Sequence, residues 1–411
     1  MTDQENPEVG LAPRLARFLL HNKPFIVVWL ALFISIAGIA MVSPLLPVFA
    51  KDMGASGIWL GLAFSGFALS QIPLMPFVGK FSDRFGKRPF LWIGLLVYAI
   101  AAIGYFWSPG YKELVFFRII SGVGSAMVIP TAFAYVGELA PRGHEGRYMG
   151  IFNTALIIGF GVGPMLGGIV HDGLGMDATF LSMGVLSCLG FLIAFFFLPG
   201  RKPSSEEEGH KEPSTPFATM LKDSNIRGII TFQMAFGSSF GAMLAFLGIY
   251  MTSTLDTSLT LVGIAMSVRA LQNGALAYPF GWLADRVNRV VLASLGLMVM
   301  ASGTLSIPWI GTVALLMGIF VVMGTFESMA IPSINAITVN RGRIYGMGSV
   351  MGVFNTAMSL GLVAGSLAGG AIEDSFGIEW VFRYAAMLGF VGIVLFNVFM
   401  RSGAAESRKD I

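Results

Sequence analysis

Long apolar runs alternate with short polar connections along almost the whole chain. An α-helix needs about 20 apolar residues to cross the ~30 Å hydrocarbon layer of a bilayer. Runs of this kind occur at residues 24–50, 58–79, 89–108, 113–138, 147–170, 178–199, 228–252, 259–281, 290–308, 311–337, 345–371 and 379–400. The pattern therefore predicts an all-α membrane protein with twelve transmembrane helices.

Composition agrees with lipid as the main solvent. Of 411 residues, 55% are hydrophobic and 12% are charged, with a mean hydropathy of +0.76, whereas a soluble protein carries roughly twice that charged fraction. The chain has no basic stripe for nucleic acid, no GxxxxGK[ST] loop and no HExxH spacing, so we expect no enzyme, cofactor or metal site. Cys188 is the one cysteine, which excludes a disulfide framework, and its apolar surroundings predict burial.

Basic residues lie mostly on one side of the predicted helices. Residues 200–227 form the one long connection, and their charges, prolines and serines predict a linker between two six-helix halves. The linker shares its side with both termini and with most of the Lys and Arg residues, while the opposite side holds only Lys51, Lys112 and Arg383. Because positive loops stay in the cytoplasm, both termini are predicted to be cytoplasmic, which requires an even number of spans.

The two halves repeat each other at a constant shift of 202 residues. Matched pairs are GKFSDR (79–84) and GWLADR (281–286), IFNTALIIGFGVGPMLGG (151–168) and VFNTAMSLGLVAGSLAGG (353–370), Gly122 and Gly324, Pro130 and Pro332, Asp172 and Asp374, and Gly175 and Gly377. Parallel repeats of this kind place a transport substrate between the halves, near mid-membrane. The predicted fold is two pseudo-symmetric six-helix bundles, at 1–199 and 228–411, joined by the linker 200–227.

A segment rich in glycine and cations follows the second predicted span. It reads GKFSDRFGKR over residues 79–88, and part of it recurs as Gly281, Asp285 and Arg286. A purely topogenic role would account for the cations, but not for the glycine and aspartate positions. The segment resembles motif A of the major facilitator superfamily, and the likeness covers essentially the whole chain.

This resemblance implies a cytoplasmic latch that stabilises an outward-open state. The matching positions are Gly79, Asp83, Arg84, Gly86, Lys87, Arg88, Glu138, Gly281, Asp285 and Arg286. Asp83 would meet the end of the eleventh span, and Arg84 would be linked to Glu138. In the second copy Asn288 replaces the second glycine and Val290 the last cation. We expect Asn288 to adopt the same left-handed turn and the second latch to be weaker.

Arg118 lies several residues inside the fourth span, in the run RIISGVGSA. A charge at the centre of a bilayer costs roughly 2.5 kcal/mol or more, so Arg118 should face a cavity or a partner. The alternative is that its side chain reaches the nearby interface. The run resembles motif B (RxxxGxG) of the same superfamily, which implies a role in proton coupling. Phe320 is its counterpart in the second half, so the fold does not require this charge.

Glycines recur on one face of the fifth span. Gly159, Gly163 and Gly167 are spaced four residues apart, Gly168 follows, and Pro164 lies inside. This spacing lets two helix backbones approach closely, and close packing alone would explain it. The pattern GxxxGPxxGG also resembles motif C, which within the superfamily marks proton-driven exporters. The eleventh span repeats the glycines but carries Ser366 instead of proline.

Glu327 is the only acidic residue well within a predicted span, near the middle of 311–337. The resemblance implies that this span lines the central cavity, and Arg269 lies midway along 259–281. We hypothesise that Arg269 and Glu327 approach each other across the cavity in at least one state and that Glu327 exchanges a proton, the alternative being a protonated or Arg-paired carboxyl that merely packs. Further candidates to contact a substrate are Ser125, Asn153, Gln272, Asn273 and Asn355.

Three function hypotheses follow. The leading one is a proton-coupled antiporter that exports a lipophilic or amphipathic compound, as the resemblance to twelve-helix drug/proton antiporters implies. The second is a symporter or facilitator that imports a small organic anion, which two cavity arginines against one carboxylate favour. The third is a non-transporting sensor or scaffold on a transporter fold, and the absence of a sizeable soluble domain counts against it. We expect a monomer in a bacterial inner membrane, with protons, lipid and a small-molecule substrate as partners.

Overall fold

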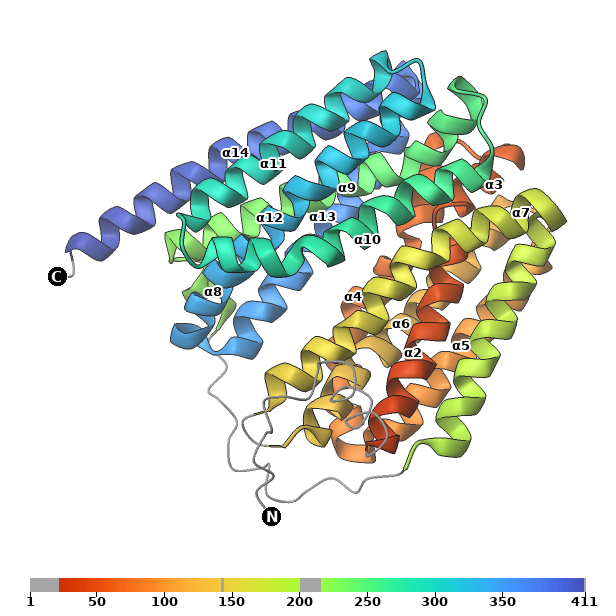
Figure 1. The fold of residues 1–411 in the computed structure, drawn as a ribbon, viewed down its shortest axis with the longest axis horizontal. Helices are drawn as coiled ribbons and strands as arrows, with labels where there is room; N and C mark the ends of the chain where they lie inside the picture. Colours follow the sequence, from red (N-terminus) through yellow and green to blue (C-terminus); the bar gives the residue numbers. More distant parts are fainter. Residues whose placement is uncertain (1–21, 142–143, 200–215, 410–411) are drawn as a thin grey trace, which may run out of the picture.

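The computed structural model describes residues 22–141, 144–199 and 216–409, and regular structure in these segments is entirely helical. The first half contains α2 (Lys23–Val42), α3 (Leu46–Asp52), α4 (Gly57–Phe85), α5 (Lys87–Phe106), α6 (Tyr111–Leu139) and α7 (Glu145–Phe197). The second half contains α8 (Phe217–Met220), α9 (Ser224–Thr254), α10 (Leu259–Ala284), α11 (Arg289–Ser306), the 3₁₀ turn η2 (Ile307–Trp309), α12 (Val313–Tyr345), α13 (Met347–Phe376) and α14 (Ile378–Lys409). Figure 1 shows the two halves as neighbouring bundles. Most of the predicted linker lies outside the described residues.

The described helices supply twelve membrane crossings. Eleven of them are long and apolar enough to span a bilayer, and one, Tyr148–Phe197, is 50 residues long. Gly175 interrupts that helix with a φ of 87°, and Figure 1 shows α7 folding back as a hairpin, so it crosses twice. Gly377 has the same φ of 87° at the repeat-related turn before α14, and a positive φ of this size favours glycine. The predicted all-helical, twelve-span fold is confirmed.

The first span, predicted at 24–50, is present over Lys23–Asp52. A turn that contains Pro44 divides it into α2 and α3, because proline cannot donate a backbone hydrogen bond. Three local predictions were wrong. The segment 79–84 lies on the last turns of α4 rather than in a loop. Asn288 has a φ of −60° and caps α11 by accepting hydrogen bonds from two backbone N–H groups, so it is not left-handed. Cys188 is exposed, not buried.

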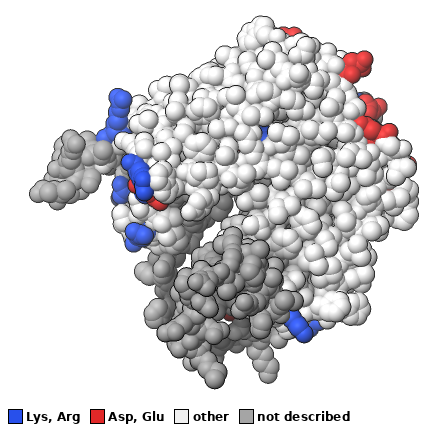
Figure 2. Space-filling view, viewed as in Figure 1, with Lys and Arg blue, Asp and Glu red and all other residues white. Residues whose placement is uncertain are grey.

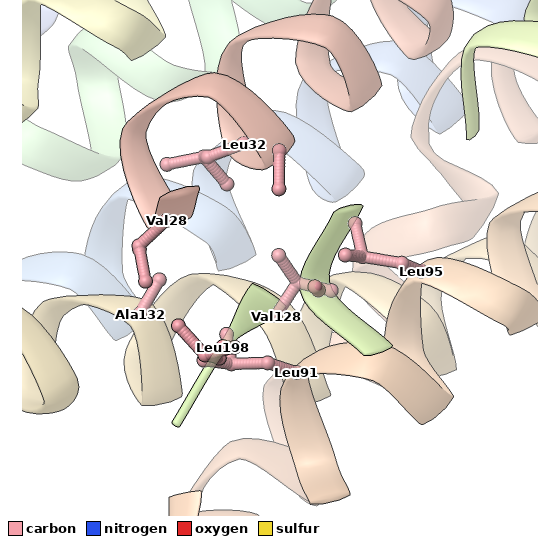
Figure 3. A pocket seen from close by; sticks show the side chains of 9 residues that line it. Val28, Leu32, Leu91, Leu95, Val128, Ala132 and Leu198 are labelled. Carbon is pink, nitrogen blue, oxygen red and sulfur yellow. The ribbon is translucent and has the colours of Figure 1, made fainter. Parts of the chain in front are cut away.

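Tightly packed apolar side chains hold each half together. In the first half, one core cluster joins α2, α5, α6 and α7. Figure 3 shows Val28, Leu32, Leu91, Leu95 and Val128 converging there on a void of about 10 Å³. A void this small with apolar walls cannot hold a ligand. A separate core cluster lies within the second half. The largest core cluster contains buried residues of both halves.

Charges gather at two opposite ends of the molecule. Figure 2 shows Lys and Arg along the left and lower edges and Asp and Glu at the upper right, with a broad uncharged surface between them. We call the end with the turns at 86, 285–288 and 346 the basic end, and the end with the turns at 53–56, 255–258 and 377 the acidic end. The uncharged surface between them matches the hydrocarbon layer of a bilayer.

Candidate functional site: a cavity between the halves

A cavity of about 470 Å³ lies between the two halves. Its wall is formed by α2, α4, α6 and α7 of the first half and by α9, α10, α12 and α13 of the second. The lining is mostly apolar, with five phenylalanines at Phe64, Phe67, Phe160, Phe240 and Phe320. Pockets of this volume hold drug-sized molecules. The cavity is therefore large enough for a drug-sized molecule.

Arg269 and Glu327 form an ion pair in the cavity wall. Nε of Arg269 donates to Oε2 of Glu327 at 2.8 Å, and the two side chains are only 7% and 9% exposed. The guanidinium also lies over the ring of Phe240, 5.1 Å from its centroid. Its Nη2 is buried and has no hydrogen-bond partner among the described residues. The predicted approach of these two residues is confirmed, whereas the proton-exchange role of Glu327 stays a prediction.

Arg118 faces the same cavity from α6. It is 2% exposed, so the alternative in which it reaches the interface is wrong. Its Nε and Nη2 donate to the carbonyl oxygen of Phe64 at 3.2 and 3.1 Å, and Nη2 also donates to Ser43 Oγ at 3.1 Å. The centroid of the Phe67 ring lies 4.8 Å from the guanidinium carbon. No acidic side chain of the described residues pairs with Arg118, so its positive charge is uncompensated within the cavity wall.

The repeat exchanges arginine and phenylalanine around the cavity. The shift of 202 residues pairs Phe67 with Arg269 and Arg118 with Phe320. All four side chains line the cavity. Of these four residues, each half contributes one arginine and one phenylalanine, but from opposite members of the matched helix pair, so the two cations lie on different sides of the pseudo-symmetric site.

A second matched set explains an unpaired amide beside the ion pair. The repeat pairs Gln71 with Asn273 and Ser125 with Glu327. In the first half, Gln71 Nε2 donates to Ser125 Oγ at 2.7 Å. In the second half, Glu327 binds Arg269 instead. Asn273 Nδ2 is left buried without a partner among the described residues, in the wall of the cavity.

Only one of the five predicted substrate-contacting residues lines the cavity, and that residue is Asn273. Ser125 accepts a hydrogen bond from Gln71 and is not part of the cavity lining. Gln272 joins α10 to α12, since its Nε2 donates to a backbone carbonyl of α12 at 2.8 Å and to a threonine hydroxyl at 2.6 Å. Asn153 and Asn355 are exposed and do not line the cavity. Sequence position alone did not separate polar side chains that face the cavity from those that join helices.

The predicted latch residues form a smaller cluster at the basic end. Lys87 pairs with Glu138 of α6 and lies 3.5 Å from Asp83. Arg84 instead lies over the ring of Phe85 on the exposed surface of α4, so its predicted link to Glu138 is not made in this state and stays a prediction for the outward-open state. The reason is local: α4 continues through this segment and carries Arg84 outward, whereas Lys87 begins α5 beside the end of α6.

The other latch residues make contacts within their own half. Arg88 donates to a backbone carbonyl of α7 at 2.7 Å. In the second copy, Asp285 pairs with Arg289 at 3.0 Å, and Arg286 lies over a tryptophan ring at 3.6 Å. Gly79 and Gly281 have open space around them, and Gly86 forms the turn between α4 and α5 with a φ of 91°. The predicted contact of Asp83 with the eleventh span stays a prediction for the other conformational state.

The halves meet near the acidic end and separate at the basic end. Among the described residues, every hydrogen bond between the halves lies toward the acidic end, on the α4–α13, α7–α10 and α3–α13 pairs. The glycines whose added Cβ would overlap the backbone of the opposite half lie toward the same end, as at Gly57, Gly168 and Gly370. The cavity is therefore closed toward the acidic end, and the halves are apart at the basic end.

The glycines of the fifth span pack against two different helices. A Cβ at Gly159, Gly163 or Gly167 would overlap α2, while one at Gly168 would overlap the backbone at the start of α10. The carbonyl of Pro164 also lies against α10. The close packing predicted from the glycine spacing is thus present, and it includes a contact between the halves. No group of three or more potential metal-ligating side chains occurs in the described part of the chain.

Comparison with known proteins gives a consistent result. The sequence profile of the Major Facilitator Superfamily matches residues 28–254 and 228–410. An uncharacterized MFS-type transporter of Methanocaldococcus jannaschii is 26% identical over 91% of this chain and 97% of its own length. Multidrug resistance protein 2 of Bacillus subtilis is 26% identical over 90% of this chain and 94% of its own. A bacterial homologue of the lysosomal transporter Spinster, solved in an inward-facing and unoccupied conformation, has a similar fold, with a TM-score of 0.77, 11% identity and coverage of 93% and 97%.

Proposed function

Since the chain belongs to the major facilitator superfamily, we propose that it is a proton-coupled antiporter that exports a lipophilic or amphipathic small molecule. It is a multi-pass membrane transporter and not an enzyme. The proposal includes a bacterial inner membrane, cytoplasmic termini and a monomeric transporter. The observation that carries it is the Arg269–Glu327 ion pair in the wall of a mostly apolar cavity.

The ion pair can link the charge of the cavity to a proton. Glu327 pairs with Arg269 only while it is ionised, and an arginine cannot lose its own proton. Protonation of Glu327 would leave the Arg269 charge unpaired and add one positive charge to the cavity. An apolar or cationic solute binds less well beside an unpaired charge. Solute and proton would thus exclude each other, which is the linkage that antiport requires.

Two further observations support export. The lining is dominated by apolar side chains, and the halves are apart at the basic end, which the distribution of Lys and Arg predicts to be cytoplasmic. A solute would then enter from the cytoplasm or from the adjacent lipid. The Bacillus subtilis relative carries the name multidrug resistance protein, which agrees with an efflux role.

The second candidate is a proton symporter for an organic anion, favoured by the excess of positive charge. Arg118 and Arg269 face the cavity against a single carboxylate, Glu327. An anion that bound Arg269 would displace Glu327, and the displaced carboxylate would take up a proton. Anion and proton would then bind together and move in the same direction, which is the opposite linkage.

Transport in proteoliposomes tests the antiport proposal. A pH gradient is imposed, and a panel of lipophilic cations, neutral aromatics and organic anions is followed with wild type, Glu327→Gln and the control Glu113→Gln at the acidic end. In wild type and in the control, we expect the proton gradient to drive solute movement in the direction opposite to the proton flow. Glu327→Gln should lose this dependence but retain solute-for-solute exchange. Full proton-driven transport by Glu327→Gln would overturn the coupling role.

A further inference from the structure

Two aspartates related by the repeat reach from one half to the other at the acidic end. Asp374, at the end of α13, accepts hydrogen bonds from the backbone N–H groups of Gly57 at 2.7 Å and Ile58 at 3.4 Å. Asp172, in α7, accepts one from the N–H of Thr260 at 2.9 Å. Gly57 and Ile58 begin α4, and Thr260 lies in the first turn of α10. Each half thus caps a helix of the other half.

The caps supply hydrogen-bond acceptors for backbone N–H groups at the starts of α4 and α10. The first N–H groups of a helix have no partner within the helix, and its N-terminus carries a partial positive charge that favours a carboxylate. Ser56, the residue before α4, makes no side-chain cap. Ser258, before α10, accepts from Leu261 and leaves the N–H of Thr260 to Asp172. The aspartates of the opposite half therefore complete both helix starts.

The same two helix pairs pack backbone against backbone beneath the caps. In the α4–α13 pair, Gly57 meets Gly370 and Gly61 meets Ser366. The α7–α10 pair repeats these contacts at the four positions related by the shift of 202 residues, which are Gly168 against Leu259 and Pro164 against Gly263. Opening of the acidic end must separate both pairs and break both caps.

We infer that Asp172 and Asp374 are positioning residues that hold the acidic end closed while the cavity is open toward the basic end. Packing between small residues sets how close the helices come, while the carboxylates add a directional attraction that exists only in the closed state. A cap of this kind is weak enough to break in every transport cycle. The inference requires alternating access of the two halves but not proton coupling or any particular substrate.

Substitutions at the two aspartates separate a gating role from a purely local one. Alanine removes the cap, whereas asparagine caps a helix about as well as aspartate does. We expect each alanine variant to raise the ratio of open to closed acidic ends about five-fold, and the double variant about 25-fold. Asp172→Asn and Asp374→Asn should stay close to the parent protein. Asp177→Ala is the matched control, because Asp177 is exposed in the same α7 hairpin as Asp172.

Double electron–electron resonance measures the distance between two spin labels and therefore reports the opening directly. Labels are attached at Lys112→Cys in α6 and Ala314→Cys in α12, exposed and repeat-related positions at the acidic end, in a Cys188→Ala background. A longer-distance population that grows from the single to the double alanine variant supports the inference. A double variant whose distances match Asp177→Ala, while the protein still elutes as a folded species, overturns it. No substrate or proton gradient is applied, so the result is independent of the antiport proposal.

Discussion

Replacing Glu327 by glutamine should cost more stability than replacing Arg269 by glutamine, although both changes break the same ion pair. Glu327→Gln leaves a buried guanidinium without its anion, and removing one partner of a buried pair costs about 3–5 kcal/mol. We expect about 3 kcal/mol, the lower end, because the pair borders a cavity. Arg269→Gln leaves a carboxyl that can bind a proton and become neutral, so we expect about 1–2 kcal/mol, the cost of a lost hydrogen bond.

The double variant completes this thermodynamic cycle. Glutamine at both positions leaves no unpaired charge, so its cost should fall below the sum of the single costs by about 2 kcal/mol. Equilibrium unfolding in mixed micelles, followed by the helical circular dichroism signal at neutral pH, measures all four proteins. Equal costs for the two single variants, or a double variant whose cost equals their sum, would refute the assignment of a buried ion pair.

Three other predictions follow from the contacts described above. Arg118→Lys should bind solute at least about ten-fold more weakly in an equilibrium binding assay, because an ammonium cannot reproduce the planar contacts with α4 and the aromatic ring. Gly167→Val should lower the melting temperature and the folded yield, since its side chain would overlap α2, whereas Gly173→Ala, in open space, should leave both unchanged. Lys87→Gln should lower stability by about 1 kcal/mol in a denaturation assay and Lys80→Gln should not, because Lys87 alone of the two pairs with Glu138.

The sequence predicted the fold because its signals are long and repeated. Twelve apolar runs, a shift of 202 residues and one-sided positive charge all indicated the same architecture. Local breaks were harder to predict. Pro44 separates α2 from α3 within a continuous apolar run, and hydropathy alone does not register the missing N–H. The helical extension of α4 through residues 80–85 was not predicted, because this segment carries several charges and charged segments are typical of loops.

The charged part of the site was more predictable than its uncharged part. Arg118, Arg269 and Glu327 stand out because ionised groups inside a membrane span require a partner or a cavity. Polar amides and hydroxyls carry no such requirement, since they can bond between helices, as Gln272 does. The match of Asp172 with Asp374 was visible as a repeat, but the capping contacts depend on how the two halves meet, which the sequence of neither half contains.

The most direct test of the central claim is the exchange of a proton when solute binds to purified protein. Lipophilic cations, neutral aromatics and organic anions are added to wild type and to Glu327→Gln in weakly buffered detergent solution, and the pH change is recorded. At a pH low enough to protonate Glu327 in the solute-free protein, the antiport account predicts proton release from wild type on binding of an apolar or cationic solute, and none from Glu327→Gln. Proton uptake on binding of an anion, or equal release from both proteins, would contradict it.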